Sequence, residues 1–283
     1  MKSLRAAEVR TQILFSLFFV VLSLLFLFPV YALLLASFRP GRDLIRFGIT
    51  LKTLLPRNLV LTYLANLPTA QGGAYPIWFR NSLMLVVLQT SFSLLFSSMV
   101  GYGLGIYQFK GKNIVLSLVL LVMMVPLQIL ILPLYRLLIF FKSMNTFHGI
   151  ILPFIVSPFA IFFFRQFVVG IPLDFVDAGR IDGLSEVGIF FRVMAPLMKP
   201  AFGAMAILSA LLSWNNFLWP LIVMRTKRMF TLPVGLAGLL TPYGNYYDLL
   251  ISGSLMATVP IIIVFFLFQR YFIAGLTAGG IKG

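Results

Sequence analysis

The chain has 283 residues, of which 60% are hydrophobic and 10% are charged, and its mean hydropathy is +1.03. Because soluble domains carry about a quarter charged residues, this composition excludes an ordinary soluble domain and indicates one membrane domain spanning residues 1–283. The formal net charge is +15, but the basic residues are dispersed between apolar runs, so we expect no nucleic acid as a partner. With no Cys and a single His, we expect no metal site.

Six apolar runs are each long enough to cross a bilayer, which takes about 20 helical residues. We therefore predict an all-α, polytopic membrane protein with six transmembrane helices in contact with lipid. The first run follows a basic N-terminus and lacks a small-residue cleavage site, so we expect a retained span and not a signal peptide. The predicted spans are Ile13–Ser37, Ser82–Tyr107, Ile114–Phe140, Ile150–Phe167, Ala201–Met224 and Leu250–Phe272.

Prolines and small residues punctuate these spans. Prolines interrupt the third, fourth and sixth spans and predict kinks there. Ser97, Gly101 and Gly105 recur every four residues in the second span, a spacing that favours close helix packing. Between the first two spans, a short amphipathic helix is expected around residues 59–67, at the outer surface.

The longest polar passage, residues 171–200, lies between the fourth and fifth spans and holds four of the seven acids. It must lie in water, because a bilayer core leaves charges and free backbone groups unsatisfied. Asp174 and Asp177 predict the N-terminal turn of a helix. Asp182-Gly183 predicts a turn.

A second short helix is expected to open at Ser185 and to end at Pro196 and Pro200. Phe190 and Phe191, with Val193 and Met194, give this helix an apolar side. Such a side packs either on the protein's own bundle or on a partner, and the pattern leaves both open.

This passage resembles the cytoplasmic coupling loop, called the EAA loop, of importer-type ABC transporter permeases. The matching positions are Asp177-Ala178-Gly179, Asp182-Gly183, Phe190 and Pro196. The chain departs from the pattern where Asp177 replaces a Glu and Gly179 replaces the second Ala. The likeness extends over most of the chain and is nearest to the maltose-permease type of carbohydrate importer.

The resemblance implies the type I ABC importer permease fold, in the inner membrane of a bacterium, with both termini cytoplasmic. It implies four partners: a second permease subunit, an ATPase subunit dimer, an extracytoplasmic solute-binding protein and a carbohydrate solute. Lys and Arg divide evenly, 11 on each side of the predicted membrane, so the positive-inside rule does not decide the orientation.

The resemblance also assigns coupling to the ATPase, with the short helix 175–180 docking in a groove on that subunit. The residues so assigned are Asp174, Asp177, Ala178, Gly179, Asp182, Gly183 and Phe190. The chain has no G-x-x-x-x-G-K-[ST] motif. We therefore expect a non-catalytic subunit with no cofactor of its own, and ATP and Mg in the partner ATPase.

Polar side chains inside the spans are candidates for the solute pathway. Asn215 and Asn216 lie between Trp214 and Trp219 in the predicted fifth span, where unpartnered amides are costly. Amides bind sugar hydroxyls and indole faces stack on sugar rings. The alternative is hydrogen bonding between helices, with an aromatic belt at the interface. The predicted pathway residues are Gln128, Tyr135, Asn215 and Asn216.

The predicted outer loop from residue 225 to 248 is rich in Tyr. In maltose-type permeases the matching loop reaches into the binding protein, which implies contacts from Tyr243, Asn245, Tyr246 and Tyr247. An ordinary interfacial belt of Tyr is the alternative. The small-residue tail, residues 272–283, is implied by the same resemblance to reach the ATPase dimer.

The predicted outer side carries eleven bases against two acids, a net charge of +9. A positive funnel concentrates anions, so we hypothesise an acidic or uronate-containing oligosaccharide as the solute. Anionic lipid headgroups or an acidic binding protein explain the charge equally well.

A stand-alone secondary transporter of a small polar solute is the alternative function. It would need ion-coupling charges inside spans, and the six predicted spans contain no Asp or Glu. A membrane-embedded enzyme ranks third, since one His and no buried acid leave little chemistry.

Overall fold

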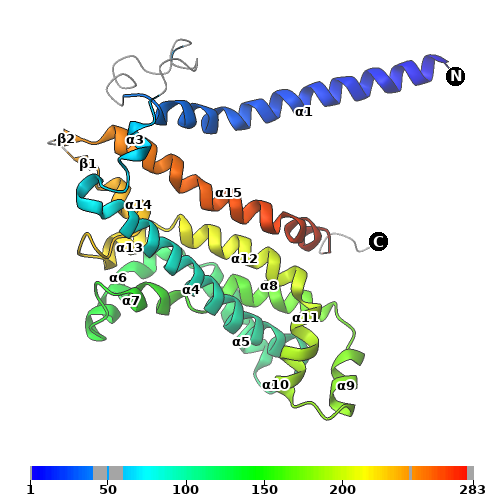
Figure 1. The fold of residues 1–283 in the computed structure, drawn as a ribbon. Helices are drawn as coiled ribbons and strands as arrows, with labels where there is room; N and C mark the ends of the chain where they lie inside the picture. The colour runs from blue at the N-terminus through cyan, green and yellow to red at the C-terminus, as the bar shows by residue number, and fades with distance from the viewer. Residues whose placement is uncertain (1, 41–49, 51–59, 242–243, 279–283) are drawn as a thin grey trace. The chain divides into compact units, whose positions relative to one another are not determined.

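The computed structural model describes residues 2–40, 50, 60–241 and 244–278. Across these residues the elements of secondary structure are helices, apart from one hairpin of two-residue strands (Figure 1). This confirms the predicted all-α class. The elements are α1 (Lys2–Ser37), α3 (Thr62–Ala65), α4 (Ala70–Ile106), α5 (Lys112–Met123), α6 (Leu127–Phe140), α7 (Phe147–Ile151), the 3-10 turn η1 (Leu152–Phe154), α8 (Pro158–Val169), α9 (Asp174–Ile181), α10 (Glu186–Ile189), the π-helical turn η2 (Phe190–Met194), α11 (Ala195–Leu197), α12 (Lys199–Trp214), α13 (Leu218–Val223), α14 (Leu232–Ala237), β1 (Leu240–Thr241), β2 (Gly244–Asn245) and α15 (Tyr247–Ala278).

Three described helices are long and apolar enough to cross a membrane: Arg10–Ser37, Ala70–Ile106, which has a left-handed kink at residues 71–73, and Tyr247–Gln269. Three further candidates are pairs of shorter helices that are bent at a break. The bends are 103° between α5 and α6, 43° between Phe147–Phe154 and α8, and 80° between Glu186–Leu197 and α12. By length and composition, the described residues therefore contain three candidate spans, or up to six if each bent pair is one span.

Two prolines predicted as kinks instead stand at helix boundaries. Pro126 adopts an extended conformation at the N-cap of α6 and separates α6 from α5. Pro158 occupies the first turn of α8, where Ser157 is the N-cap and its hydroxyl accepts from the Ala160 amide at 3.3 Å. Proline lacks an amide proton, so it is tolerated in a first turn and breaks an interior one. Pro260, by contrast, lies inside α15 as predicted.

The prediction of one helix through Asn215 and Asn216 is wrong. Helix α12 ends at Trp214, and α13 begins only at Leu218. The Asn215 side chain donates to the Leu211 carbonyl at 3.0 Å and so competes with the backbone ladder. Pro220 has no amide to donate four residues back, to Asn216. The break places two amides beside one another outside regular helix.

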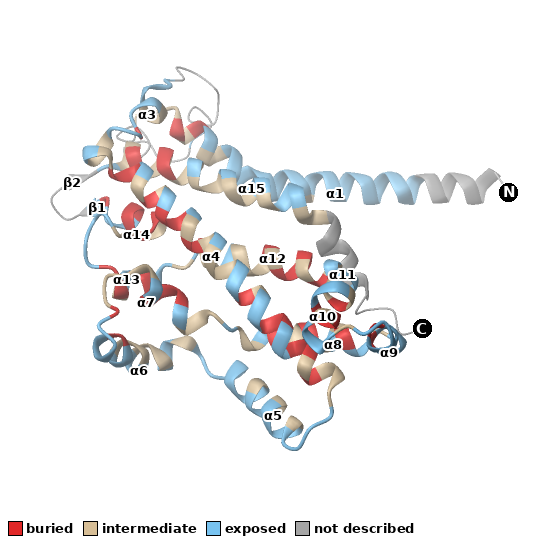
Figure 2. Ribbon diagram, turned by 60° about the horizontal axis from the view of Figure 1, so that its bottom comes forward, coloured by how far each residue is buried: buried red, intermediate tan, exposed pale blue. Residues whose placement is uncertain are grey.

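The chain divides into two compact units. Unit 1 comprises residues 1–73 and 236–258, and unit 2 comprises residues 74–235 and 259–283. In unit 1 the most apolar window of α1 is 0% buried, and Figure 2 colours most of that helix as exposed. The end of α1 is tied to the start of α15, because the buried Ser252 hydroxyl donates to the Ser37 carbonyl at 3.3 Å.

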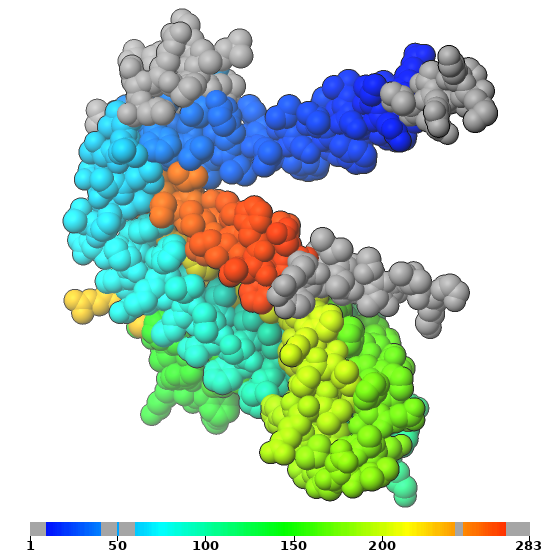
Figure 3. All heavy atoms as spheres, turned by 45° about the vertical axis from the view of Figure 1, so that its right-hand side comes forward, coloured from blue at the N-terminus to red at the C-terminus, as the bar shows by residue number. Residues whose placement is uncertain are grey.

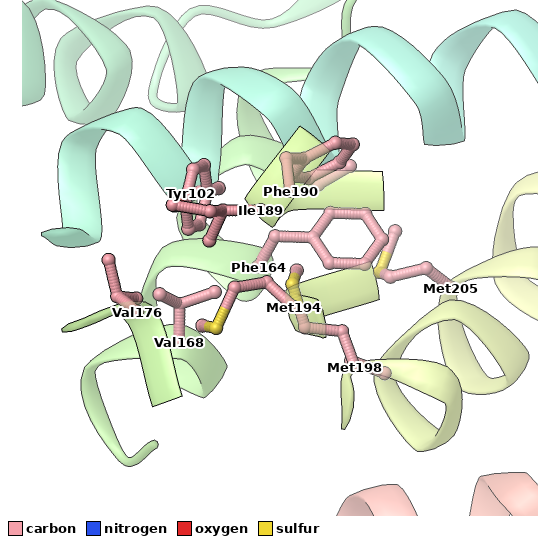
Figure 4. Close-up of a cluster of buried hydrophobic side chains, with 11 residues drawn as sticks. Tyr102, Phe164, Val168, Val176, Ile189, Phe190, Met194, Met198 and Met205 are labelled. Atoms are coloured by element: carbon pink, nitrogen blue, oxygen red, sulfur yellow. The ribbon is translucent and has the colours of Figure 1, made fainter. Parts of the chain in front are cut away.

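Unit 2 holds the main hydrophobic core, which joins α4, α8, α9, η2 and α12 (Figure 4). The small-residue spacing of α4 allows its contact with α8, as predicted. A Cβ on Gly101 would lie 2.8 Å from the Ile161 carbonyl oxygen, and one on Gly105 would lie 2.9 Å from Val168. The helices therefore approach at a distance that only glycine permits.

Other sequence expectations differ in extent. The amphipathic helix expected around residues 59–67 is the four-residue α3. Helix α15 continues past the predicted end of the sixth span, as far as Ala278. Asp43, Tyr243 and the last five residues of the tail lie outside the described residues.

Candidate coupling segment and solute cavity

The polar passage folds as the predicted helix, turn and helix. Asp174 and Asp177 lie in the first turn of α9, where free amides and the helix dipole favour acids. Gly183 has a φ of +76°, a left-handed conformation that glycine adopts without strain. The Ser185 hydroxyl accepts from the Gly188 amide at 3.1 Å and so caps α10. Figure 3 shows this segment, in green to yellow, at one end of unit 2.

The second helical segment ends at Leu197, between the two prolines expected to end it, and the chain bends there by 80° into α12. Helical structure continues from Glu186 through the π-helical turn, in which the Ala195 amide donates five residues back, to Phe190. Pro196 and Pro200 each stand in the first turn of a following helical segment, α11 and α12. The wider π turn accommodates the missing amide of Pro196, and the chain bends at Met198.

The inner faces of the segment are buried in the core of unit 2. Val176 of α9, Ile189 of α10 and Phe190 of η2 are almost fully inaccessible (Figure 4). A Cβ on Gly179 would lie 3.0 Å from Ile189 Cγ1, so the glycine that departs from the family pattern lets α9 lie closely on α10. The apolar side therefore packs on the protein's own bundle, although Phe191 remains half exposed.

The outer face of α9 carries large apolar side chains without cover. Ile181 is 86% exposed and Phe175 is 45% exposed. Ala178, Asp174 and Asp182 are also exposed. Among the coupling residues predicted from the sequence, Gly179 and Phe190 face inward, and the others lie on this free side or in the turn.

An ionic network that the sequence did not reveal ties the segment to α4. Arg180 donates to Glu186 at 2.8 Å and to Asp177 at 3.1 Å. The Tyr107 hydroxyl, just beyond α4, donates to the same Glu186 carboxylate at 2.6 Å. The Arg180 guanidinium, and then Tyr107, hold the pKa of the Glu186 carboxyl below its usual value. Tyr107 and Glu186 are 79 residues apart, so no local pattern pairs them.

A cavity of about 460 Å³, lined by both apolar and uncharged polar side chains, lies elsewhere in unit 2. It brings together three of the four predicted pathway residues, Gln128, Asn215 and Asn216. Its other polar lining residues are Gln89, Ser93, Ser157, Ser209 and Ser213. Among the described residues that line it, none is charged.

Helix breaks create this cavity. It lies where α6 begins after Pro126, where α8 begins after Ser157, and where α12 ends before Asn215. Irregular backbone at membrane depth is tolerated where it lines a cavity. Ser213 donates to the Gln89 side chain at 3.0 Å, which fixes one wall. Gln89 and Ser213 were not assigned from sequence, because an isolated polar residue in a span signals packing as readily as binding.

Neither tryptophan near the asparagine pair lines the cavity. Trp219 is fully buried and its indole donates to the Gly149 carbonyl at 3.2 Å. Trp214 packs edge-on against Phe79, with ring centroids 5.6 Å apart. Both indoles therefore pack within the protein in this structure. Tyr135 lines a different pocket, where its hydroxyl accepts from Arg225 at 3.2 Å.

The loop after α13 is held by buried polar side chains of α4. Trp78 donates to the Lys227 carbonyl at 2.8 Å, and Asn81 donates to the Arg228 and Phe230 carbonyls at 2.8 and 3.0 Å. The Ser82 hydroxyl accepts from the Leu232 amide at 2.8 Å. These bonds satisfy the loop backbone and leave its basic side chains exposed.

Of the four predicted binding-protein contacts, Tyr246 and Tyr247 can be placed with their side chains. Tyr246 is 54% exposed, and Tyr247 begins α15. Asn245 lies in β2 opposite Leu240 of β1. Tyr243 lies outside the described residues, and these contacts remain predictions.

Residues 93–277 match the family model described as "Binding-protein-dependent transport system inner membrane component". The chain belongs to this family. It is 56% identical over 275 residues to the arabinooligosaccharides transport system permease protein AraQ of Bacillus subtilis, covering 96% of each chain. It is 34% identical to the lactose transport system permease protein LacG of Rhizobium radiobacter, covering 90% of this chain and 91% of the relative.

A solved structure has the same fold. It is a bacterial ABC transporter involved in the import of the acidic polysaccharide alginate, and one of its chains matches with a TM-score of 0.81 at 20% identity. The match covers 94% of this chain and 98% of that one. The predicted permease fold is therefore confirmed.

The family defines a non-catalytic, multi-pass permease subunit of the inner membrane, without a cofactor of its own. ATP is hydrolysed in a separate subunit, and a solute-binding protein is the second kind of partner. This membership decides against the stand-alone secondary transporter and the membrane-embedded enzyme. The described residues contain no group of three His, Cys, Asp or Glu side chains that could hold a metal ion.

Proposed function

We propose that this permease translocates a neutral oligosaccharide by alternating access. The observation that carries the proposal is the cavity bounded by Gln128, Asn215 and Asn216, which offers amides and hydroxyls without a formal charge. Such groups exchange hydrogen bonds with sugar hydroxyls, and a charged solute would be left without a counterion there. The names of the 56% and 34% identical relatives, for arabinooligosaccharides and lactose, support a carbohydrate.

An acidic oligosaccharide is the second candidate. The excess of basic residues on the predicted outer side favours it, because a positive funnel raises the local concentration of anions. The uncharged cavity favours the neutral solute instead. Uptake of a labelled neutral oligosaccharide and of a labelled uronate-containing one, measured separately, distinguishes the two. Uptake of the neutral solute alone supports the first candidate, and uptake of the uronate alone supports the second.

The free face of α9 is proposed as the docking surface for the ATPase. Exposed Phe175 and Ile181 would enter a groove on that subunit, as helices do in helix-in-groove recognition. Asp174, Asp177, Ala178, Asp182 and Gly183 would shape this surface, while buried Gly179 and Phe190 would fix it to the bundle. ATP and Mg would bind in the ATPase dimer, whose closing would move the segment as a rigid body.

Two further partners and the orientation complete the proposal. The most apolar stretch of α1 is 0% buried in this chain, which leaves it free to contact a second permease subunit. Tyr243, Asn245, Tyr246 and Tyr247 would contact the solute-binding protein on the outer side. Both termini would then be cytoplasmic, on the same side as residues 171–200.

Reconstitution of the complete transporter in nanodiscs tests the proposal. Asn216→Ala and Gln128→Ala should raise the solute concentration that half-saturates uptake, while binding-protein-stimulated ATP hydrolysis persists. Asn66→Ala, at the exposed C-cap of α3, is the control. Wild-type uptake kinetics in both cavity variants would contradict the proposed pathway.

A further inference from the structure

A second pocket, of about 360 Å³, lies between α6 and α13. Four aliphatic side chains line it, and Tyr135 and Arg225 are its polar members. The Arg225 guanidinium donates to the Tyr135 hydroxyl at 3.2 Å. The positive charge of Arg225 therefore lies beside the aliphatic wall of the same pocket. The aliphatic residues are Ile131, Leu132, Leu221 and Ile222.

The backbone that carries Arg225 is fixed in place. The Asn145 side-chain oxygen accepts from the Arg225 amide at 2.8 Å and from the Thr226 amide at 3.2 Å. The backbone N–H of Asn145 donates to the Val223 carbonyl at 2.9 Å. These hydrogen bonds join the turn after α6 to the end of α13. They thereby position the Arg225 side chain at the pocket.

This corner of unit 2 is positively charged, and no acid of unit 2 lies in its sequence segments. Arg136 of α6 and Lys142 of the following turn are exposed, as is Arg225. All acids of unit 2 fall between residues 174 and 186, in the coupling segment. The acids that pair with Arg180, Asp177 and Glu186, lie in the coupling segment and not in this corner. The charges here are therefore free to attract an external anion.

The end of α6 carries the features of a membrane interface. Phe140 is 78% exposed and Phe141 is 67% exposed, and Lys142 follows directly. Leu132, Arg136 and Phe140 recur every four residues and share one exposed face of α6. Aromatic and basic side chains at the end of a lipid-facing helix lie at headgroup depth, with basic groups reaching outward.

We infer that this pocket binds an anionic phospholipid, with its phosphate on Arg225 and Tyr135 and one acyl chain along the aliphatic wall. Arg225 supplies the charge and donors that a phosphate needs. Tyr135 orients the guanidinium and can donate its own proton to a phosphate oxygen. Arg136 and Lys142 add long-range attraction. This lipid site is separate from the uncharged cavity. The inference requires that the chain is inserted in a membrane, but it does not depend on which solute is transported.

The test uses the complete transporter reconstituted in nanodiscs of equal phosphatidylglycerol and phosphatidylcholine, released into mild detergent, with retained lipids counted by native mass spectrometry. We expect preferential retention of phosphatidylglycerol, lowered about fivefold by Arg225→Gln, since one basic residue near an anionic surface has about that effect. Leu132→Trp should lower retention by filling the groove while the charge remains. Arg225→Lys keeps the positive charge and should retain most of the phosphatidylglycerol that Arg225→Gln loses. This result would show that the loss in Arg225→Gln comes from the missing charge and not from misfolding of the site.

Lys110→Gln is the matched control, because Lys110 is also an exposed base and lies in the turn between α4 and α5. Equal phosphatidylglycerol retention by wild type and Arg225→Gln would overturn the inference, as would equal retention of both lipids. A cross-link from Leu132→Cys to another protein subunit would overturn it too, because a protein would then fill the groove.

Discussion

The two ends of unit 2 are joined by the same apolar helices but satisfy their polar groups in opposite ways. The coupling end holds every acid of the unit and uses exposed ionic bonds among Asp177, Arg180 and Glu186. The other end uses buried neutral side chains, Trp78 and Asn81, to hold a basic loop by its backbone. Exposed ion pairs contribute little to stability, whereas losing a buried hydrogen-bond donor is costly. The first end can therefore be remodelled by a partner, and the second is rigid.

The largest effect on stability is expected at the contact between α4 and α8, because α4 carries residues of both ends of unit 2. Gly101→Leu would force a side chain into the Ile161 carbonyl and separate α4 from α8. Overpacking of this kind costs about 1–3 kcal/mol or more, so we expect loss of folded complex in size-exclusion chromatography. Gly103→Leu is the matched control, since a Cβ there meets its first neighbour at 4.0 Å. Equal yields of the two variants would refute the close packing.

Asn81→Ala tests the rigid end. It removes the donor to two loop carbonyls, at a cost of about 1–3 kcal/mol for buried groups left unpaired. We expect trypsin to cut after Arg225, Lys227 and Arg228 roughly tenfold faster, because opening of the loop becomes easier. Gln108→Ala, at an exposed position, should leave the cleavage rate at the wild-type value. A loop equally resistant in Asn81→Ala would contradict the role given to this side chain.

Glu186→Gln tests the coupling end and should have a smaller effect on stability than Asn81→Ala, because the ion pair is exposed to solvent. Its effect should appear in coupling, as less solute transported for each ATP hydrolysed by the complete transporter. Tyr107→Phe removes the second bond to the carboxylate and should act in the same direction. If the two changes are strictly additive in a double-mutant cycle, the network is not a unit.

The smallest effect concerns pH. The folded pKa of Glu186 is lowered by Arg180, so the ionic network stabilises the segment at neutral pH and this contribution disappears as pH falls through the lowered pKa. The acid-induced loss of thermal stability should therefore be slightly smaller in Glu186→Gln than in wild type. Identical pH profiles of the melting temperature would show that the network contributes nothing.

The class and the coupling segment could be predicted from sequence because their signals are local. Hydropathy marks the spans, and Asp182-Gly183 and Ser185 mark a turn and a cap within a few residues. The network of Tyr107 with Glu186 could not be predicted, since it joins positions 79 residues apart. Hydropathy also could not locate the break at Asn215, because two amides and a proline change the mean apolarity of a long run very little.

The closest test of the account is a site-specific cross-link at α9 in the assembled transporter. The chain contains no Cys, so Ile181→Cys introduces its one thiol at a position that is 86% exposed. We predict that a photoactivatable maleimide on this thiol cross-links to the ATPase subunit, and that a membrane-impermeant maleimide fails to label it in intact cells. Labelling from outside the cell, without a cross-link to the ATPase, would contradict the account.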